Sequence, residues 1–157
     1  MSIERCREYF REFGIEDRIM EFDVSSATVE LAAQAVGVIP ARIAKTLSFK
    51  TPESCMLIVT AGDSRIDNKK FKERFGFKAK MLTPDEVLEL VGHPVGGVCP
   101  FGIDPDIPVY LDKSMIRFKS VFPAVGSANS AIELTNEELF KYSNAIEWVD
   151  VCKLPGE

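Results

Sequence analysis

The spacing of apolar and polar positions predicts helices and strands in roughly equal number. Apolar residues recur at helical spacing in residues 3–13, 28–36 and 68–75, and each stretch is followed by a glycine. Two Thr-x-x-Glu capping boxes, at residues 83–86 and 135–138, predict helices that end near residues 91 and 142. An apolar run predicts a buried strand at 55–61, and shorter patterns predict strands at 19–22, 43–49, 77–82, 109–111, 121–125, 131–134 and 146–151.

These elements are interspersed, but several strands follow one another directly. We therefore predict an α+β (mixed α/β) fold, with a central mixed, barrel-like β-sheet surrounded by helices. The chain of 157 residues has the length of one typical domain, so we expect residues 1–157 to form a single domain. A hydrophobic share of 46% is enough for a packed core and argues against disorder.

The charge of the chain limits the partners that it could bind. A formal net charge of −5 argues against a protein that coats nucleic acid without regard to sequence. A local basic cluster could still hold one end of a nucleic acid, or be an ordinary solvated face, and its members are Lys69, Lys70, Lys72, Arg74, Lys78 and Lys80. The N-terminus is charged from the start, and no apolar run approaches the ~18 residues of a membrane span. We therefore expect a cytoplasmic protein with no membrane partner.

The cysteines lack the spacing of a metal-binding motif. Cys6, Cys55, Cys99 and Cys152 are far apart in sequence, and the chain has one histidine. A structural zinc site would have to be assembled from scattered ligands, and a cytosolic setting favours reduced thiols. We expect no metal and no cofactor.

A lysine occupies an unusual position in the predicted strand 43–49. Because strand side chains alternate between faces, Lys45 shares one face with the large apolar residues Ile43, Leu47 and Phe49. Its ammonium could extend to water at a strand edge. It could instead lie at the floor of a cleft, where it would attract a carboxylate, a phosphate or a carbonyl oxygen.

Residues 92–108 form a long loop, of the kind that often has a function. Its adjacent glycines, Gly96 and Gly97, would let backbone amides approach a ligand and stabilise an oxyanion, or would simply form a tight turn. His93 and Cys99 lie on the same loop and suggest a cysteine–histidine nucleophile, but no third residue orients the histidine. We favour His93 as a residue of the cleft rim.

Two further segments carry candidate polar groups. In the turn at 126–130, Gly126 and Ser127 could form the wall of a small pocket and Asn129 could donate to a ligand, or the segment could be a plain hairpin turn. Asp63 directly follows the predicted buried strand and is a weaker candidate.

Taken in order, these motifs resemble one protein family. The order is Ala44-Lys45-Thr46-Leu47, Ala61-Gly62-Asp63, Lys69-Lys70, Gly96-Gly97-Val98-Cys99-Pro100, and Gly126-Ser127 before Ile132-Glu133-Leu134. The chain resembles the YbaK-type aminoacyl-tRNA deacylases, which are free-standing relatives of the editing domain inserted in bacterial prolyl-tRNA synthetases. The resemblance covers about residues 20–150.

The resemblance implies hydrolysis of the ester between a wrong amino acid, often alanine or cysteine, and proline tRNA. It implies that Lys45 helps to position the aminoacyl-adenosine end, and that the loop from Gly96 and Gly97 to Pro100 shapes the pocket and contacts the carbonyl through its backbone. It also implies a reaction without a catalytic metal. The expected partner is the aminoacylated 3′ end of a tRNA, and prolyl-tRNA synthetase is an optional second one.

The resemblance thus assigns catalysis to Lys45, Gly96 and Gly97. The residues that we expect to bind substrate are Thr46, Asp63, His93, Val98, Cys99, Pro100, Gly126, Ser127 and Asn129. Many relatives carry a glycine- and arginine-rich turn where this chain has residues 127–130, which lack arginine. This departure motivates one alternative, a non-catalytic regulator that binds tRNA or a synthetase, and a second alternative is an enzyme that uses Cys99 as its nucleophile.

Overall fold

The computed structural model describes residues 2–157. None of the helices in this range is long and apolar enough to cross a membrane. The α-helices are α1 (Ser2–Arg11), α2 (Val29–Val36), α3 (Asn68–Phe75), α4 (Pro84–Leu90) and α5 (Asn136–Tyr142), and the 3-10 turns are η1 (Glu16–Arg18), η2 (Pro40–Arg42) and η3 (Lys113–Arg117). The strands are β1 (Met20–Glu21), β2 (Ile43–Lys50), β3 (Cys55–Ala61), β4 (Arg65–Ile66), β5 (Val109–Asp112), β6 (Ser120–Pro123), β7 (Ser130–Ala131), β8 (Leu134–Thr135), β9 (Glu147–Val149) and β10 (Cys152–Lys153).

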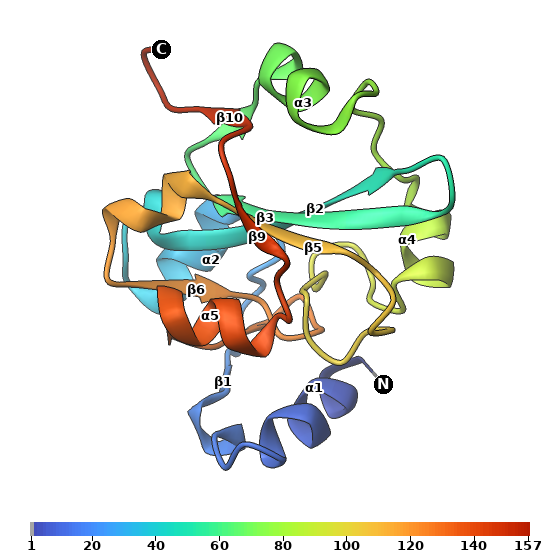
Figure 1. The fold of residues 1–157 in the computed structure, drawn as a ribbon. Helices are drawn as coiled ribbons and strands as arrows, with labels where there is room; N and C mark the ends of the chain where they lie inside the picture. The colour runs from blue at the N-terminus through green and yellow to red at the C-terminus, as the bar shows by residue number, and fades with distance from the viewer. Residues whose placement is uncertain (1) are drawn as a thin grey trace.

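A curled, half-barrel sheet forms the centre of the molecule (Figure 1). Its strand order is β8-β6-β2-β3-β5-β9, and the pairings mix parallel and antiparallel neighbours. Strands β2 and β3 form a long antiparallel pair, in which Lys45 lies opposite Thr60. Two small sheets, β1-β7 and β4-β10, lie beside it. The predicted α+β class with a mixed, barrel-like sheet is confirmed.

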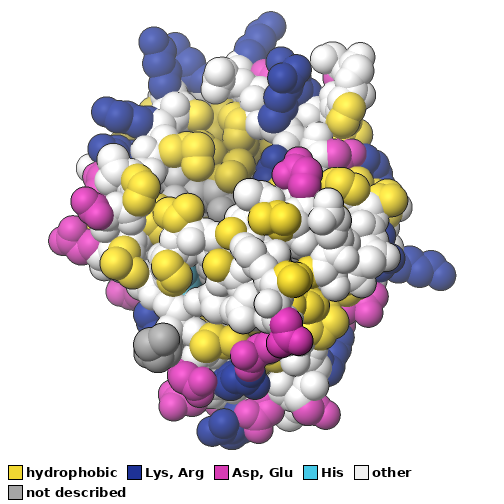
Figure 2. Space-filling model, turned by 180° about the vertical axis from the view of Figure 1, so that it is seen from behind, with side chains coloured by type: hydrophobic (Ala, Val, Ile, Leu, Met, Phe, Trp, Pro, Cys, Tyr) yellow, Lys and Arg dark blue, Asp and Glu magenta, His cyan; other side chains and the backbone are white. Residues whose placement is uncertain are grey.

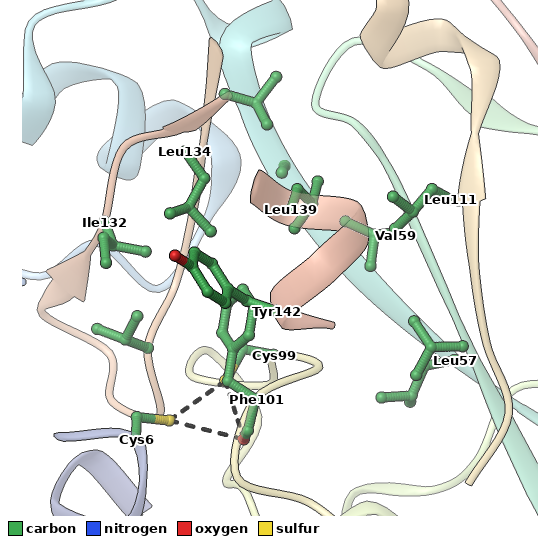
Figure 3. Close-up of a cluster of buried hydrophobic side chains, with 14 of the residues drawn as sticks. Cys6, Leu57, Val59, Cys99, Phe101, Leu111, Ile132, Leu134, Leu139 and Tyr142 are labelled. Atoms are coloured by element: carbon green, nitrogen blue, oxygen red, sulfur yellow. Dashed lines mark hydrogen bonds between the residues drawn. The ribbon is translucent and has the colours of Figure 1, made fainter. Parts of the chain in front are cut away.

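Both faces of the central sheet are covered. Every residue of β3 is buried, as its continuous apolar run predicts. Leu57 and Val59 point into the larger core, which also contains Phe101 and Tyr142 (Figure 3). The alternate residues Met56 and Ile58 pack with Phe71 of α3 in a second core on the other face. The period-2 alternation of β3 therefore serves two cores at once.

The chain departs from the predicted elements at two places. The expected strand at 77–82 is wrong: the only ladder contact there is a single bridge between Phe49 and Met81, because the segment uses its apolar side chains to pack on the second core. The expected strand at 131–134 is divided into β7 and β8, because β7 pairs with β1 whereas β8 pairs with β6. Both predicted capping boxes, at Thr83 and Thr135, are present with reciprocal hydrogen bonds.

Candidate functional site

A cavity of about 380 Å³ opens beside β2. Its walls come from the start of α2, from β2, from the segment that leads into α4, from the glycine-rich loop and from the ends of β6 and β7. The lining residues are mostly apolar, which is typical of small-molecule sites. The polar side chains in the lining are Ser26, Thr28, Lys45, Thr46, Ser48 and Ser130.

The cavity exists because one edge of β2 is uncovered in its middle. Strand β6 pairs with β2 only at Ile43 and Ala44 and ends at Pro123, which has no N–H to continue a ladder. On the same edge the next backbone partner is Leu82, whose N–H donates to the carbonyl of Ser48 at 3.1 Å. Because backbone groups of alternate residues point to the same edge, the N–H and C=O of Thr46 face the gap. A ligand in the cavity would meet an unpaired piece of strand backbone.

Lys45 lines this cavity with its ammonium held from behind. Its Nζ donates to the carbonyl of Gly62 at 3.3 Å and to the carbonyl of Ser64, both in the turn after β3. An ammonium has three protons, so one remains for a ligand. Partial burial lowers the pKa of Lys45, and the negative charge of nearby Asp63 acts in the opposite direction. The ammonium is thus fixed in place and partly desolvated, and both features strengthen its attraction for an anionic or carbonyl oxygen.

Two hydroxyl groups in the cavity wall are buried without a partner. Neither Ser26 Oγ nor Thr46 Oγ1 makes a hydrogen bond to any described residue. A buried hydroxyl that lacks a partner costs free energy in the unliganded protein, so such groups commonly serve a ligand. Thr46 is among the predicted site residues, whereas Ser26 was missed by sequence reasoning because its burial depends on a long-range backbone bond to the carbonyl of Ala128, at 2.6 Å.

The adjacent glycines have different surroundings. Gly96 lines the cavity, with a φ of +92° that favours glycine, and it lies against Ala27. Gly97 is buried outside the cavity lining, and its carbonyl accepts the N–H of Gly126 at 3.0 Å. Val98 again lines the cavity. The loop therefore offers Gly96 and Val98 to a ligand, and it uses Gly97 to contact the turn at Gly126.

The polar groups of the 126–130 turn bond to the protein itself. Ser127 Oγ donates to Asn129 Oδ1 at 2.9 Å, and Asn129 Nδ2 donates to the carbonyl of Phe22 at 3.1 Å. Gly126, Ser127 and Asn129 all lie outside the cavity lining, whereas Ser130 is part of it. The lack of arginine in this turn therefore changes no group of the cavity wall.

Four other predicted site residues also lie outside the lining. Asp63 is paired with both terminal nitrogens of Arg117, at 2.6 and 3.1 Å, and this pairing lowers the pKa of Asp63. His93 and Cys99 are fully buried in the larger core, and burial raises the pKa of the Cys99 thiol. Pro100 is buried and borders a separate small hollow. This placement gives Cys99 no access to a substrate in the cavity.

A basic segment leads into the cavity rim. Residues 69–80 run along α3 and the following segment to Met81, which lines the cavity. Within this segment Lys70 and Arg74 are paired with Asp150 and Glu147. The remaining lysines are exposed and form no ion pair with the residues that the structure describes, and they are Lys69, Lys72, Lys78 and Lys80. Figure 2 shows Lys and Arg side chains gathered at the end of the molecule that carries α3, above a hollow with hydrophobic side chains.

Comparison with known proteins identifies the family. Residues 24–142, well over half of the chain, match the model of the aminoacyl-tRNA editing domain, and the chain belongs to that family. The resemblance drawn from the sequence motifs is confirmed.

Its relatives include both free-standing proteins and domains of larger ones. The uncharacterized protein YwhH of Bacillus subtilis (strain 168) is 55% identical over 98% of each chain. The proline–tRNA ligase of Thermosipho melanesiensis is 30% identical over 132 residues, which are 83% of this chain and 23% of the ligase. A crystal structure of "a putative trans-editing enzyme for prolyl tRNA synthetase" has a TM-score of 0.87 and 30% identity, and the match covers 97% of both chains.

Proposed function

We propose that this protein is a trans-editing hydrolase of the cytoplasm that removes alanine or cysteine from mischarged proline tRNA. The observation that supports this most directly is the composition of the cavity, in which the ammonium of Lys45 and the unpaired hydroxyls of Ser26 and Thr46 lie among apolar walls. The family, and the relatives described as parts or partners of prolyl-tRNA synthetase, support the same assignment.

The chemistry asks little of the protein. An aminoacyl ester is already activated, so positioning the ester and stabilising its developing oxyanion supply most of the rate. Water attacks the carbonyl carbon, the bond to the ribose oxygen breaks, and that oxygen takes up the proton that the water loses. The vicinal hydroxyl of the tRNA assists the transfer, and with a cysteinyl substrate the thiol of the substrate is an alternative nucleophile.

In this proposal Lys45 holds the aminoacyl-adenosine end through its remaining proton. Thr46, through its hydroxyl and its unpaired backbone groups, and the loop at Gly96 contact the acyl group. The apolar walls select by size, which separates neighbouring amino acids by about 1–3 kcal/mol per methylene. Selection by size alone predicts graded rather than absolute preference among small amino acids.

The test is a deacylation panel on proline tRNA charged with alanine, cysteine, serine or proline, with and without prolyl-tRNA synthetase. We expect release of alanine or cysteine well above the rate without protein, and little release of proline. Binding of tRNA without any release would instead support the non-catalytic regulator. Equal release of all four amino acids would contradict selection by the cavity.

A further inference from the structure

Three buried side chains from distant parts of the sequence meet next to the glycine-rich loop. Cys6 comes from α1, and His93 and Cys99 come from the loop itself. All three are fully buried. Cys6 Sγ lies 3.6 Å from Cys99 Sγ, and Cys99 Sγ lies 3.5 Å from His93 Nε2. Their ligand atoms all lie within 4.8 Å of one another.

A backbone oxygen completes the group. The carbonyl oxygen of Phe101 lies 2.8 Å from His93 Nε2, 3.7 Å from Cys6 Sγ and 3.8 Å from Cys99 Sγ, and Figure 3 shows it beside both cysteines. In a tetrahedral zinc site with Zn–S of about 2.3 Å and Zn–N of about 2.0 Å, neighbouring ligand atoms are roughly 3.3–3.8 Å apart. The separations that involve sulfur fall in this range. The shorter contact from His93 fits a hydrogen bond, which a metal ion would replace.

Hydrogen bonding among these groups does not account for their presence in a core. Thiols are weak donors and acceptors, and His93 Nδ1 has no partner among residues 2–157. A fully buried imidazole with an unpaired nitrogen is costly, and such groups commonly indicate a bound ion or a redox function. No carboxylate belongs to the group, so its donors are two sulfurs, one imidazole nitrogen and one carbonyl oxygen.

We propose that Cys6, His93 and Cys99, with the carbonyl oxygen of Phe101, bind one Zn²⁺ ion. Thiolate and imidazole ligands suit zinc, and two thiolates neutralise its charge in an apolar core. On binding, each protonated thiol releases its proton to solvent, and the imidazole binds through Nε2 with its proton on Nδ1. A shell closed by four protein donors is structural rather than catalytic, so this site is separate from the editing reaction.

The position of the ion gives it a defined effect. It would tie α1 to the loop that carries Gly96 and Val98, and both of these residues line the cavity. Occupancy would therefore stabilise the protein and fix one wall of the cavity. At a free zinc concentration about 100-fold above the Kd, the melting temperature should rise by roughly 5–10 °C.

The test uses the full chain, reduced and freed of metal with a chelator, and supplied with equimolar Zn²⁺ or Co²⁺. We expect about one zinc per chain after desalting, and a cobalt spectrum with thiolate charge-transfer absorption. Cys6→Ser and Cys99→Ser should each lower retained zinc at least about tenfold. Cys55→Ser and Cys152→Ser, which change cysteines of comparable burial outside the group, should retain it.

Several outcomes would overturn the proposal. One is a reduced wild-type chain that retains no zinc, and another is Cys6→Ser retaining as much as wild type. A third is a Cys6–Cys99 disulfide in the freshly isolated, metal-free protein, because that result would assign the pair to redox chemistry instead. The wild-type cobalt spectrum decides the matter even where Cys99→Ser fails to fold.

Discussion

A Cβ atom on Gly97 would lie 2.5 Å from the backbone nitrogen of Ser127. The glycine-rich loop and the 126–130 turn therefore touch backbone to backbone, and Gly97 is required by this contact rather than by contact with a ligand. The contact places Gly96 and Val98 at the cavity and leaves the polar groups of the turn outside it.

Gly97→Ala should destabilise the protein, because backbone atoms cannot move aside as a side chain would. We expect a loss of about 3 kcal/mol in the free energy of unfolding, measured by urea denaturation. Gly76→Ala is the matched control, since Gly76 has a φ of +82° and open space around its Cβ position. It should lose only the ~1 kcal/mol of a strained left-handed residue. Equal losses in the two variants would refute the backbone contact as the reason for Gly97.

Lys45→Met should lower deacylation by about 10²–10³-fold, as expected for the loss of one well-placed donor to the reacting group. Methionine keeps the apolar stem and removes the ammonium, so the fold should persist. The measurement is the single-turnover rate on the best substrate of the deacylation panel. Lys113→Met, at an exposed position outside the cavity, is the control and should keep the wild-type rate. A Lys45→Met protein of full activity would remove this lysine from the mechanism.

The position of Lys45 was predictable from the sequence, whereas the assembly around it was not. The period of two along 43–49 correctly placed Lys45 with Ile43, because alternation is a local property of any strand. The burial of Ser26 and the meeting of Cys6 with Cys99 depend on contacts between segments about 90 or more residues apart in sequence. No local pattern encodes such contacts, so the orphan hydroxyl and the cysteine–histidine group became visible only in the structure.

Thr46→Val should affect stability and activity in different directions. In the unliganded protein the hydroxyl has no partner, so its removal should leave the free energy of unfolding unchanged or raise it by up to about 1 kcal/mol. The same change removes a hydrogen bond to substrate, and kcat/KM should fall about 3–10-fold. Thr60→Val, at the position paired with Lys45 on β3 and outside the cavity, should leave kcat/KM unchanged. A large loss of stability in Thr46→Val would show that its hydroxyl has a structural partner.

The four exposed lysines between α3 and the cavity should hold the phosphates of the tRNA. Replacing Lys69, Lys72, Lys78 and Lys80 together with alanine should weaken tRNA binding. The slope of log affinity against log salt should become shallower by roughly 0.7–0.9 for each phosphate that the variant no longer neutralises. Fluorescence anisotropy at several salt concentrations measures both quantities. Hydrolysis of a short aminoacyl-adenosine ester should be unaffected, since the cavity is unchanged. A double variant at Lys113 and Lys119 is the control, and an identical slope in the two proteins would place the tRNA elsewhere.

The ion pair between Arg18 and Glu138 should make stability depend on acidic pH. The guanidinium of Arg18, 2.8 Å from the carboxylate, lowers the pKa of Glu138 from 4.5 to about 2. Because the folded-state pKa is depressed, the stabilisation is present above the unfolded pKa and is lost as the pH falls from about 4.5 toward 2. Glu138→Gln keeps an acceptor for the N–H of Thr135, so it should melt below wild type at neutral pH and approach it at a pH near 2. Glu137→Gln, one residue earlier on the exposed side of α5, should match wild type throughout, and a constant gap for Glu138→Gln at all pH values would assign its effect to the helix cap instead.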